Sequence, residues 1–297
     1  MTSKKLRLFT AVWGDKHLEW FKEYCLKSLC GPLNSEALRG ATWVFATKEE
    51  EQGRITEIVK ASGLKIEGIE FIIFDKHFGT NPHAAGAYMN HALLNEMNAC
   101  ISLGAQSLTA PPDTIFGDGS INGLLVLGRQ PNTVVFAAHV RVHPSISNAG
   151  HLSNAQLVSE AWRNLHKTWS EAEIGLEKIN SYVGGVSWEY ASENLYAVTH
   201  RLPTPYLINW TPEDYVYFRS QIHYGVLDHS WPAECLIETG RMRVAGSSDL
   251  AFMCEITEPE NNIPPLAPYH DHEPDLFWRN LSHNKINRMF KIIFRGE

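Results

Sequence analysis

Three short apolar runs alternate with two helical segments at the start of the chain, and this order constrains the fold more than any other feature. The runs cover residues 6–12, 41–46 and 69–74 and are rich in β-branched and aromatic side chains. Residues 17–29 and 48–62 lie between them and repeat their apolar side chains at helical spacing. A β-α-β-α-β order of this kind predicts a parallel sheet with helices on its faces.

The same alternation continues beyond these runs. Pro82 suits the first position of a helix over residues 83–103. Strands are then expected over 105–110 and 133–138, with a helix over 121–129 between them. The predicted fold class is therefore α/β, with a Rossmann-like, mostly parallel central sheet.

The second half of the sequence is less regular. It predicts helices over 154–169, 171–183 and 276–294 and strands over 196–199, 206–210, 236–244 and 250–256. We expect residues 1–150 to form the Rossmann-like half and residues 151–297 an irregular half of the same compact domain.

Composition limits the class of protein. The 297 residues are 44% hydrophobic and 20% charged, as in soluble globular proteins. A net charge of −7 argues against a general nucleic-acid-binding surface, although residues 279–295 form a basic tail. The sequence contains neither an apolar run long enough to span a membrane nor the apolar core of a signal peptide, and its five cysteines include no Cys-x-x-Cys pair. These features predict reduced thiols and a cytoplasmic location.

An acidic turn follows the fourth predicted strand. Residues 107–120 run from an apolar segment through Pro111-Pro112 to Asp113 and Asp118, and Gly119-Ser120 then opens a helix. Because ligands of open α/β sheets bind outside the carboxyl ends of the strands, this turn is the first candidate site. The structural alternative is that Asp113 begins a turn while Asp118 or Ser120 caps the following helix.

Common nucleotide and hydrolase motifs are absent. The first predicted strand is not followed by G-x-G-x-x-G, and the sequence has no P-loop, no H-E-x-x-H and no G-x-S-x-G nucleophile elbow. These absences disfavour dinucleotide oxidoreductases, P-loop ATPases and serine hydrolases.

The first 140 residues resemble one known superfamily. Residues 6–13 with the helix over 17–29, the second strand over 41–47, and Pro111-Pro-Asp-Thr-Ile-Phe after the fourth strand are similar to the opening of GT-A glycosyltransferases. That resemblance implies a nucleotide-sugar donor, an unidentified acceptor and an Asp-x-Asp motif that holds a divalent cation against the diphosphate. Here Pro111 occupies the first acidic position and Asp113 the second.

The resemblance also implies a set of site residues. The donor is expected at Val12, Trp13, Thr47, His83, Asp113 and Asp118, and the metal, Mn²⁺ or Mg²⁺, at Asp113, Asp118 and His270. One carboxylate with phosphate oxygens and waters can hold Mg²⁺. Without a metal, a cation or a helix N-terminus must neutralise the diphosphate, and the candidates are the helix start at His83, Arg141, Lys16 and the basic tail.

A carboxylate base is expected to accept the proton of the acceptor hydroxyl. The two candidates are Asp228, which is followed by His229, and Asp249 in the segment Gly246-Ser-Ser-Asp. The structural alternative for Asp228 is a turn ahead of Pro232.

Two other functions stay open at this point. The incomplete Asp-x-Asp motif is also compatible with an inactive protein of the same fold that only binds a nucleotide or sugar. A different metal-dependent α/β enzyme, such as a nucleotidyltransferase or a phosphate-ester hydrolase, also places carboxylates at strand ends.

Overall fold

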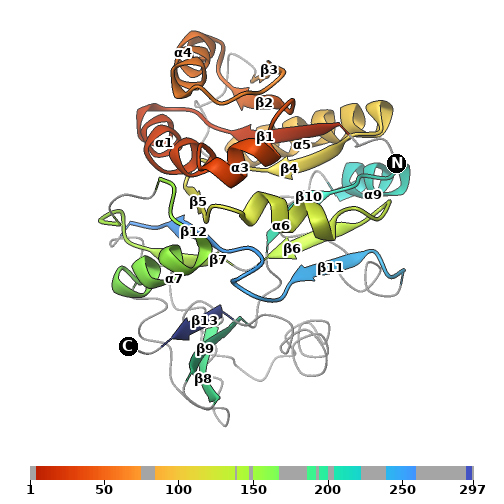
Figure 1. Cartoon of the computed structure of the whole chain (residues 1–297). Helices are drawn as coiled ribbons and strands as arrows, with labels where there is room; N and C mark the ends of the chain where they lie inside the picture. The colour runs from red at the N-terminus through yellow and green to blue at the C-terminus, as the bar shows by residue number, and fades with distance from the viewer. Residues whose placement is uncertain are drawn as a thin grey trace.

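The structure, a computed structural model, describes residues 5–74, 84–137, 139–146, 150–166, 186–191, 194–199, 204–221, 239–258 and 292–295. A seven-stranded sheet in the order β11-β6-β10-β4-β1-β2-β3 forms its centre (Figure 1). The strands are β1 (Leu6–Ala11), β2 (Thr42–Thr47), β3 (Gly68–Ile73), β4 (Gln106–Thr109), β6 (Val134–Ala137), β10 (Thr204–Ile208) and β11 (Met242–Ala245). Every neighbouring pair is parallel except the two that involve β10, which runs antiparallel to β4 and β6.

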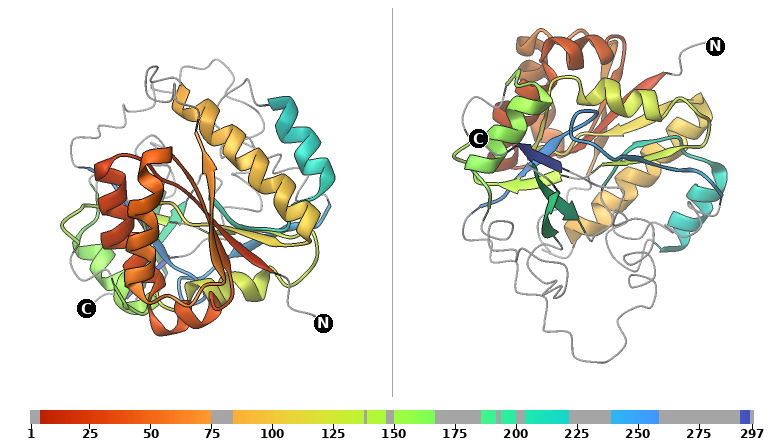
Figure 2. Two further views of the ribbon diagram at one scale, coloured as in Figure 1. Left: turned by 90° about the horizontal axis from the view of Figure 1, so that it is seen from above. Right: turned by 60° about the horizontal axis from the view of Figure 1, so that its bottom comes forward.

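Helices cover both faces of this sheet. They are α1 (Asp15–Trp20), the π-helical turn η1 (Phe21–Leu26), α2 (Lys27–Leu29), α3 (Pro32–Ala37), the 3₁₀ turn η2 (Glu49–Glu51), α4 (Gln52–Ser62), α5 (Ala84–Leu103), α6 (Ser120–Leu127), α7 (Asn154–Arg163) and α9 (Pro212–Gln221). The left view of Figure 2 shows α5 and α9 on one side of the strands and α1, α4 and α6 on the other. The predicted α/β class with a mostly parallel central sheet is confirmed.

Aromatic packing buries β2 between β1 and β3. Trp43 and Phe45 of β2 are fully buried, and their rings stack with centroids 5.1 Å apart. Phe21 meets both rings edge-on at 5.4 Å, which fixes the helical segment from Asp15 to Leu29 on this face. Strands buried on both faces require such continuous apolar runs, and the first two runs of the sequence provide them for β1 and β2.

A buried ion pair fixes α5 on the opposite face. The guanidinium of Arg7 on β1 donates to Glu96 of α5 through Nε at 2.9 Å and Nη2 at 2.9 Å. Nη2 also donates to Glu70 of β3 at 2.8 Å. The side chain of Glu96 is fully buried, whereas that of Glu70 is 55% exposed.

The structure also contains two small sheets. One has the order β5-β12-β7, from β5 (Thr114–Phe116), β12 (Met253–Ile256) and β7 (His139–Val142). Because β5 follows β4 and β7 follows β6, this sheet lies at the carboxyl ends of the central strands (Figure 1). The other has the order β13-β9-β8, from β13 (Ile292–Arg295), β9 (Asn194–Thr199) and β8 (Val186–Ala191).

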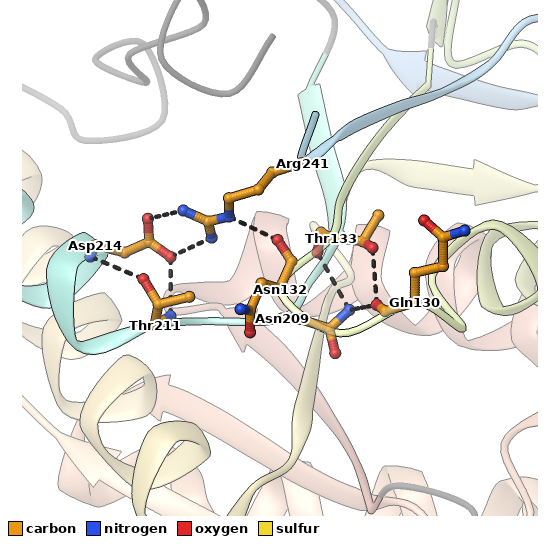
Figure 3. A network of polar contacts seen from close by, with 7 residues as sticks. All are labelled: Gln130, Asn132, Thr133, Asn209, Thr211, Asp214 and Arg241. Atoms are coloured by element: carbon orange, nitrogen blue, oxygen red, sulfur yellow. Dashed lines mark hydrogen bonds and ion pairs between the residues drawn. The ribbon is translucent and has the colours of Figure 1, made fainter. Parts of the chain in front are cut away.

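Polar contacts join the end of the antiparallel strand β10 and the start of α9 to the segments that precede β6 and β11 (Figure 3). Arg241 binds both carboxylate oxygens of Asp214, at 2.9 and 2.7 Å, and its Nε donates to the carbonyl of Asn132 at 2.6 Å. The amide of Asn209 donates to the carbonyl of Thr133 at 3.2 Å. These residues therefore have a structural role, which secures segments from the second half of the chain against the first.

Several expectations for individual elements are wrong or incomplete. Residues 292–295, predicted as the end of a helix, form the strand β13, and the rest of that predicted helix lies outside the described residues, as does the helix expected over 171–183. The elements α3, β5, β8 and α9 were not expected. The first helical segment ends at Leu29, just before Gly31-Pro32 as expected, but Pro32 also begins α3, because its missing N–H is tolerated in a first turn.

Candidate active site

Asp113 lies in a tight turn at the carboxyl end of β4. The hydroxyl of Thr10 donates to the carbonyl of Ala110 at 2.7 Å, and the indole of Trp43 donates to that hydroxyl at 2.9 Å. The backbone of Thr114 closes the turn by donating to the carbonyl of Pro111 at 3.1 Å. The carbonyl of Asp113 accepts from the backbone of Ile256 at 2.8 Å, so β12 fixes the turn from the other side.

A histidine, an arginine and a glutamate lie beside this turn on the small sheet. Glu255 of β12 binds Nε2 of His139 at 2.7 Å and Nε of Arg141 at 3.3 Å, both on β7. The three side chains are between 22% and 26% exposed. We term these three partly buried side chains the β7–β12 cluster.

The two carboxylates of this region have pKa values that lie far apart. Burial and the charge of Glu255 raise the pKa of Asp113 to about 7. Burial also acts to raise the pKa of Glu255, but the charges and hydrogen bonds of His139 and Arg141 lower it to about 2. Two neighbouring acids with such different affinities for a proton are typical of active sites, although structural ion pairs also produce them.

Two buried side chains underlie the turn. Burial, with the charges of Glu255 and Asp113, raises the pKa of the Tyr206 phenol well above its ordinary value. Burial and the charge of Asp113 do the same for the Cys25 thiol, which contacts the carbonyl of Ala110 at 4.0 Å. Both groups therefore stay neutral and add no charge beneath the β7–β12 cluster.

Asp118, the second acid of the turn, caps a helix. Its Oδ1 accepts from the backbone N–H groups of Leu33 and Asn34, both at 2.9 Å, at the start of α3. Asn34 reciprocates, because its Oδ1 accepts from the backbone of Gly119 at 3.0 Å and of Ile121 at 3.1 Å, at the start of α6. Asp118 thus has the capping role of the structural alternative, but on α3, a helix that the sequence did not reveal, rather than on α6.

Replacing Asp118 with alanine is expected to lower the free energy of unfolding by about 1–2 kcal/mol, because the start of α3 loses its acceptor. Asp118→Asn keeps an acceptor oxygen and should lose less. Urea unfolding followed by tryptophan fluorescence measures both. Equal stability of Asp118→Ala and the wild type would show that the cap contributes nothing.

Of the expected donor-binding residues on the first two strands, Trp13 has its side chain partly accessible. Its ring meets Phe74 edge-on with centroids 5.4 Å apart. The side chains of Val12 and Thr47 are fully buried. The Thr47 hydroxyl donates to Glu51 at 2.9 Å, and Glu51 accepts from the backbone of Gly14 at 2.6 Å, so this contact shapes the loop after β1.

Of the remaining expected site residues, the structure describes Asp249. The side chain of Asp249 is exposed on the loop between β11 and β12, and Asn154 donates to its backbone carbonyl at 3.1 Å. Asp228, His83 and His270 lie outside the described residues. Within the described part of the chain, no three His, Cys, Asp or Glu side chains gather into a group that could hold a metal ion.

Sequence reasoning missed His139 and Glu255 as site residues and considered Arg141 only as one cation among several. A signal was present in the run His-Val-Arg-Val, where polar and apolar side chains alternate with the period of a strand. The structure confirms the alternation, since Val140 and Val142 are fully buried while His139 and Arg141 share the other face. Glu255 is the single charge in the apolar run 250–256, which is a second such signal.

No protein-family model matches the chain, and no curated protein matches it. Similar solved structures include apo mouse xyloside xylosyltransferase 1, with a TM-score of 0.33 and 14% identity over 46% of this chain and 53% of that one. The inositol-1-phosphate CTP transferase from T. maritima has a TM-score of 0.41 and 11% identity over 87% and 92%. S. aureus TarS 1-349 has a TM-score of 0.38 and 12% identity over 85% and 60%.

The match thus spans about half the length of the mouse xylosyltransferase chain. Likenesses at these TM-scores carry no argument about activity, which has to come from the residues. The helices in the described ranges include none that combines the length and the apolar character needed to cross a membrane.

Proposed function

We propose that this protein transfers a sugar from a nucleotide-sugar donor to an acceptor, with the donor diphosphate at the turn that carries Asp113. One observation carries the proposal: Asp113, at the carboxyl end of β4, lies beside the His139, Arg141 and Glu255 cluster of a separate small sheet. In open α/β sheets this end of the strands is the ligand-binding end. The Pro-Pro-Asp-Thr-Ile-Phe segment, which resembles the GT-A motif, supports the same assignment.

The reaction requires groups in the site that stabilise negative charge on the leaving diphosphate. As the bond between the sugar carbon and the diphosphate oxygen breaks, its electron pair stays with the nucleoside diphosphate, which gains negative charge. The acceptor oxygen bonds to the sugar carbon, and its proton passes to a base, for which Asp228 and Asp249 stay the predicted residues. Groups placed where negative charge develops are the strongest contributors to such a step.

The donor set at this turn does not fit the two-carboxylate clamp that the motif implies. Pro111 offers no side-chain ligand, and Asp118 is bound to the start of α3. Glu255 is bound to His139 and Arg141. The proposed reaction therefore contains no step at a metal ion.

The direct test is release of nucleoside diphosphate from a donor without any acceptor. The purified chain is incubated with a panel of UDP- and GDP-sugars, with Mn²⁺ and with EDTA, and released UDP or GDP is measured beside calorimetric binding. We expect one donor to bind and to be hydrolysed faster than without protein. Binding without release or transfer to any acceptor would instead favour an inactive binding protein, and no binding of any donor would contradict the proposal.

A further inference from the structure

Two side chains beside Asp113 stand out because Pro111 offers no second carboxylate there and Asp118 is bound to the start of α3. Arg141 and His139 lie two residues apart on β7 and therefore on one face of the strand. Nucleoside diphosphates that do not meet a metal need basic groups of this kind. The question is whether the two side chains are held in a way that lets them bind an anion.

Glu255 leaves the anion-binding edge of Arg141 open. It contacts the guanidinium at Nε, at 3.3 Å, and no hydrogen bond joins Nη1 or Nη2 to another of the described residues. The side chain as a whole is 22% exposed. A guanidinium fixed at Nε by a carboxylate keeps parallel N–H groups for two phosphate oxygens.

Glu255 also contacts His139. Its Oε2 lies 2.7 Å from Nε2 of that ring. One carboxylate therefore joins both side chains and orients the guanidinium of Arg141 at the end of the sheet where the donor is expected. The arrangement costs no rearrangement when an anion arrives, which is the property that makes such groups effective.

We propose that Arg141, oriented by Glu255, binds the diphosphate of the donor directly and takes the place of a divalent cation. This inference rests on the proposed function and specifies how the leaving group is held. When the sugar–oxygen bond breaks, the electron pair remains on the diphosphate, and its added charge is met by the guanidinium of Arg141. No metal ion takes part in that step.

Inorganic pyrophosphate is the probe, because it carries the diphosphate without the base or the sugar. Calorimetry in EDTA compares the wild type with Arg141→Gln. We expect the wild type to bind pyrophosphate in EDTA and Arg141→Gln to bind it at least about ten-fold more weakly, the usual effect of losing a hydrogen bond to a charged group.

Arg39→Gln is the matched control. The Nε of Arg39 also binds a glutamate, Glu36 at 3.2 Å, but both side chains are more than half exposed, with Glu36 on α3 and Arg39 two residues beyond its end. Its removal should leave pyrophosphate binding unchanged. In Arg141→Gln, Glu255 keeps its charge but loses its contact with the guanidinium. The double variant Arg141→Gln/Glu255→Gln removes that charge as well. If the single variant binds pyrophosphate weakly because it lacks the guanidinium, and not because it misfolds, the double variant should bind pyrophosphate equally weakly.

Three outcomes decide the matter. Binding in EDTA that is lost in Arg141→Gln and kept in Arg39→Gln supports the inference. Binding that needs Mg²⁺ and is the same in Arg141→Gln overturns it, while release of nucleotide from a donor with Mg²⁺ would leave the proposed function in place. Absence of pyrophosphate binding under both conditions, together with absence of donor release, would overturn both.

Discussion

Asp113→Ala is expected to lower donor hydrolysis and transfer by at least about a hundred-fold, because the protonated Asp113, whose pKa is about 7, can donate a hydrogen bond where the diphosphate gains negative charge. The turn itself should persist, because its hydrogen bonds use the carbonyl oxygens of Ala110, Pro111 and Asp113 rather than the Asp113 carboxylate. Measuring nucleoside diphosphate release by the wild type and the variant tests this. Turnover at the wild-type rate would remove Asp113 from the site.

A second measurement at the same residue separates function from stability. The pKa of Asp113 in the folded protein is about 7, against an ordinary value of 3.8 that applies to the unfolded chain. Below the lower value both states hold the proton, so the group does not affect stability. As the pH rises from there to 7, the unfolded state releases the proton first, so stability falls, and above 7 the loss is complete.

Asp113→Asn should therefore be more stable than the wild type at pH 8, and nearly equal to it below the ordinary pKa of the acid. Because each pKa unit corresponds to about 1.4 kcal/mol, the gain at pH 8 should reach about 2–4 kcal/mol. Urea unfolding in EDTA at a series of pH values gives the difference. A difference that does not grow with pH would show that burial and Glu255 do not disfavour the charged form.

Asp118→Asn is the natural comparison for both measurements, because it changes the other acid of the same turn. Its carboxylate binds the start of α3, so donor release should stay close to the wild-type rate. Loss of release in Asp118→Asn, with the fold retained, would return Asp118 to the site.

The sequence predicted the regular part of the fold because its signals there are local. Each of the first three strands is an apolar run bounded by turn residues, and the helices between them carry their own periodicity. Gly63 and Gly104 end α4 and α5 with positive φ angles of 74° and 61°, as a helix-ending glycine often does. Information of this kind lies within a dozen residues and needs no tertiary contact.

The second half was less predictable because its elements are completed by distant partners. Strand β10 contains Pro205 and lies between β4 and β6 from the first half, which no local pattern indicates. Helix α9 begins at Pro212 with a cap between Thr211 and Asp214, and that aspartate is in turn held by Arg241. Such elements depend on contacts that the chain makes only after folding.

In the candidate site, too, the residue with a local sequence signal was predicted, and the residues that depend on distant contacts were not. Asp113 was predicted because it ends a recognisable strand, whereas His139, Arg141 and Glu255 become neighbours only when β12 pairs with β7. Asp118 was assigned to the site for its proximity in sequence, and the structure instead gives its carboxylate to α3. Closeness along the chain therefore identified the turn, but only the sheet register identified its partners.

The buried Arg7–Glu96 pair leads to the largest expected loss of stability. Glu96 makes close contacts with Nε and Nη2 of Arg7, and the thiol of Cys100 lies 3.1 Å from its Oε1. Burial raises the pKa of Glu96 although Arg7 opposes that change. Glu96→Ala removes the carboxylate and leaves the guanidinium buried beneath α5 with only Glu70 as a partner.

We expect Glu96→Ala to lower the free energy of unfolding by about 3–5 kcal/mol, because breaking a buried pair leaves a charge without its partner. Glu70→Ala is the matched control: it removes the other partner of the same guanidinium, but from a side chain that is 55% exposed. Such a solvent-exposed ion pair contributes about 1 kcal/mol or less. Urea unfolding at neutral pH measures both, and a loss in Glu96→Ala no larger than in Glu70→Ala would contradict the argument.

A third variant distinguishes the cost of a stranded charge from the intrinsic value of the pair. In Arg7→Met/Glu96→Met both charges are replaced by flexible apolar side chains, and neither is left to be buried alone. Because the desolvation of two charges offsets most of their attraction, this double variant should be at least as stable as Glu96→Ala and within about 1–2 kcal/mol of the wild type. A double variant as unstable as Glu96→Ala would instead mean that the pair itself, and not the unpaired guanidinium, holds α5 against the sheet.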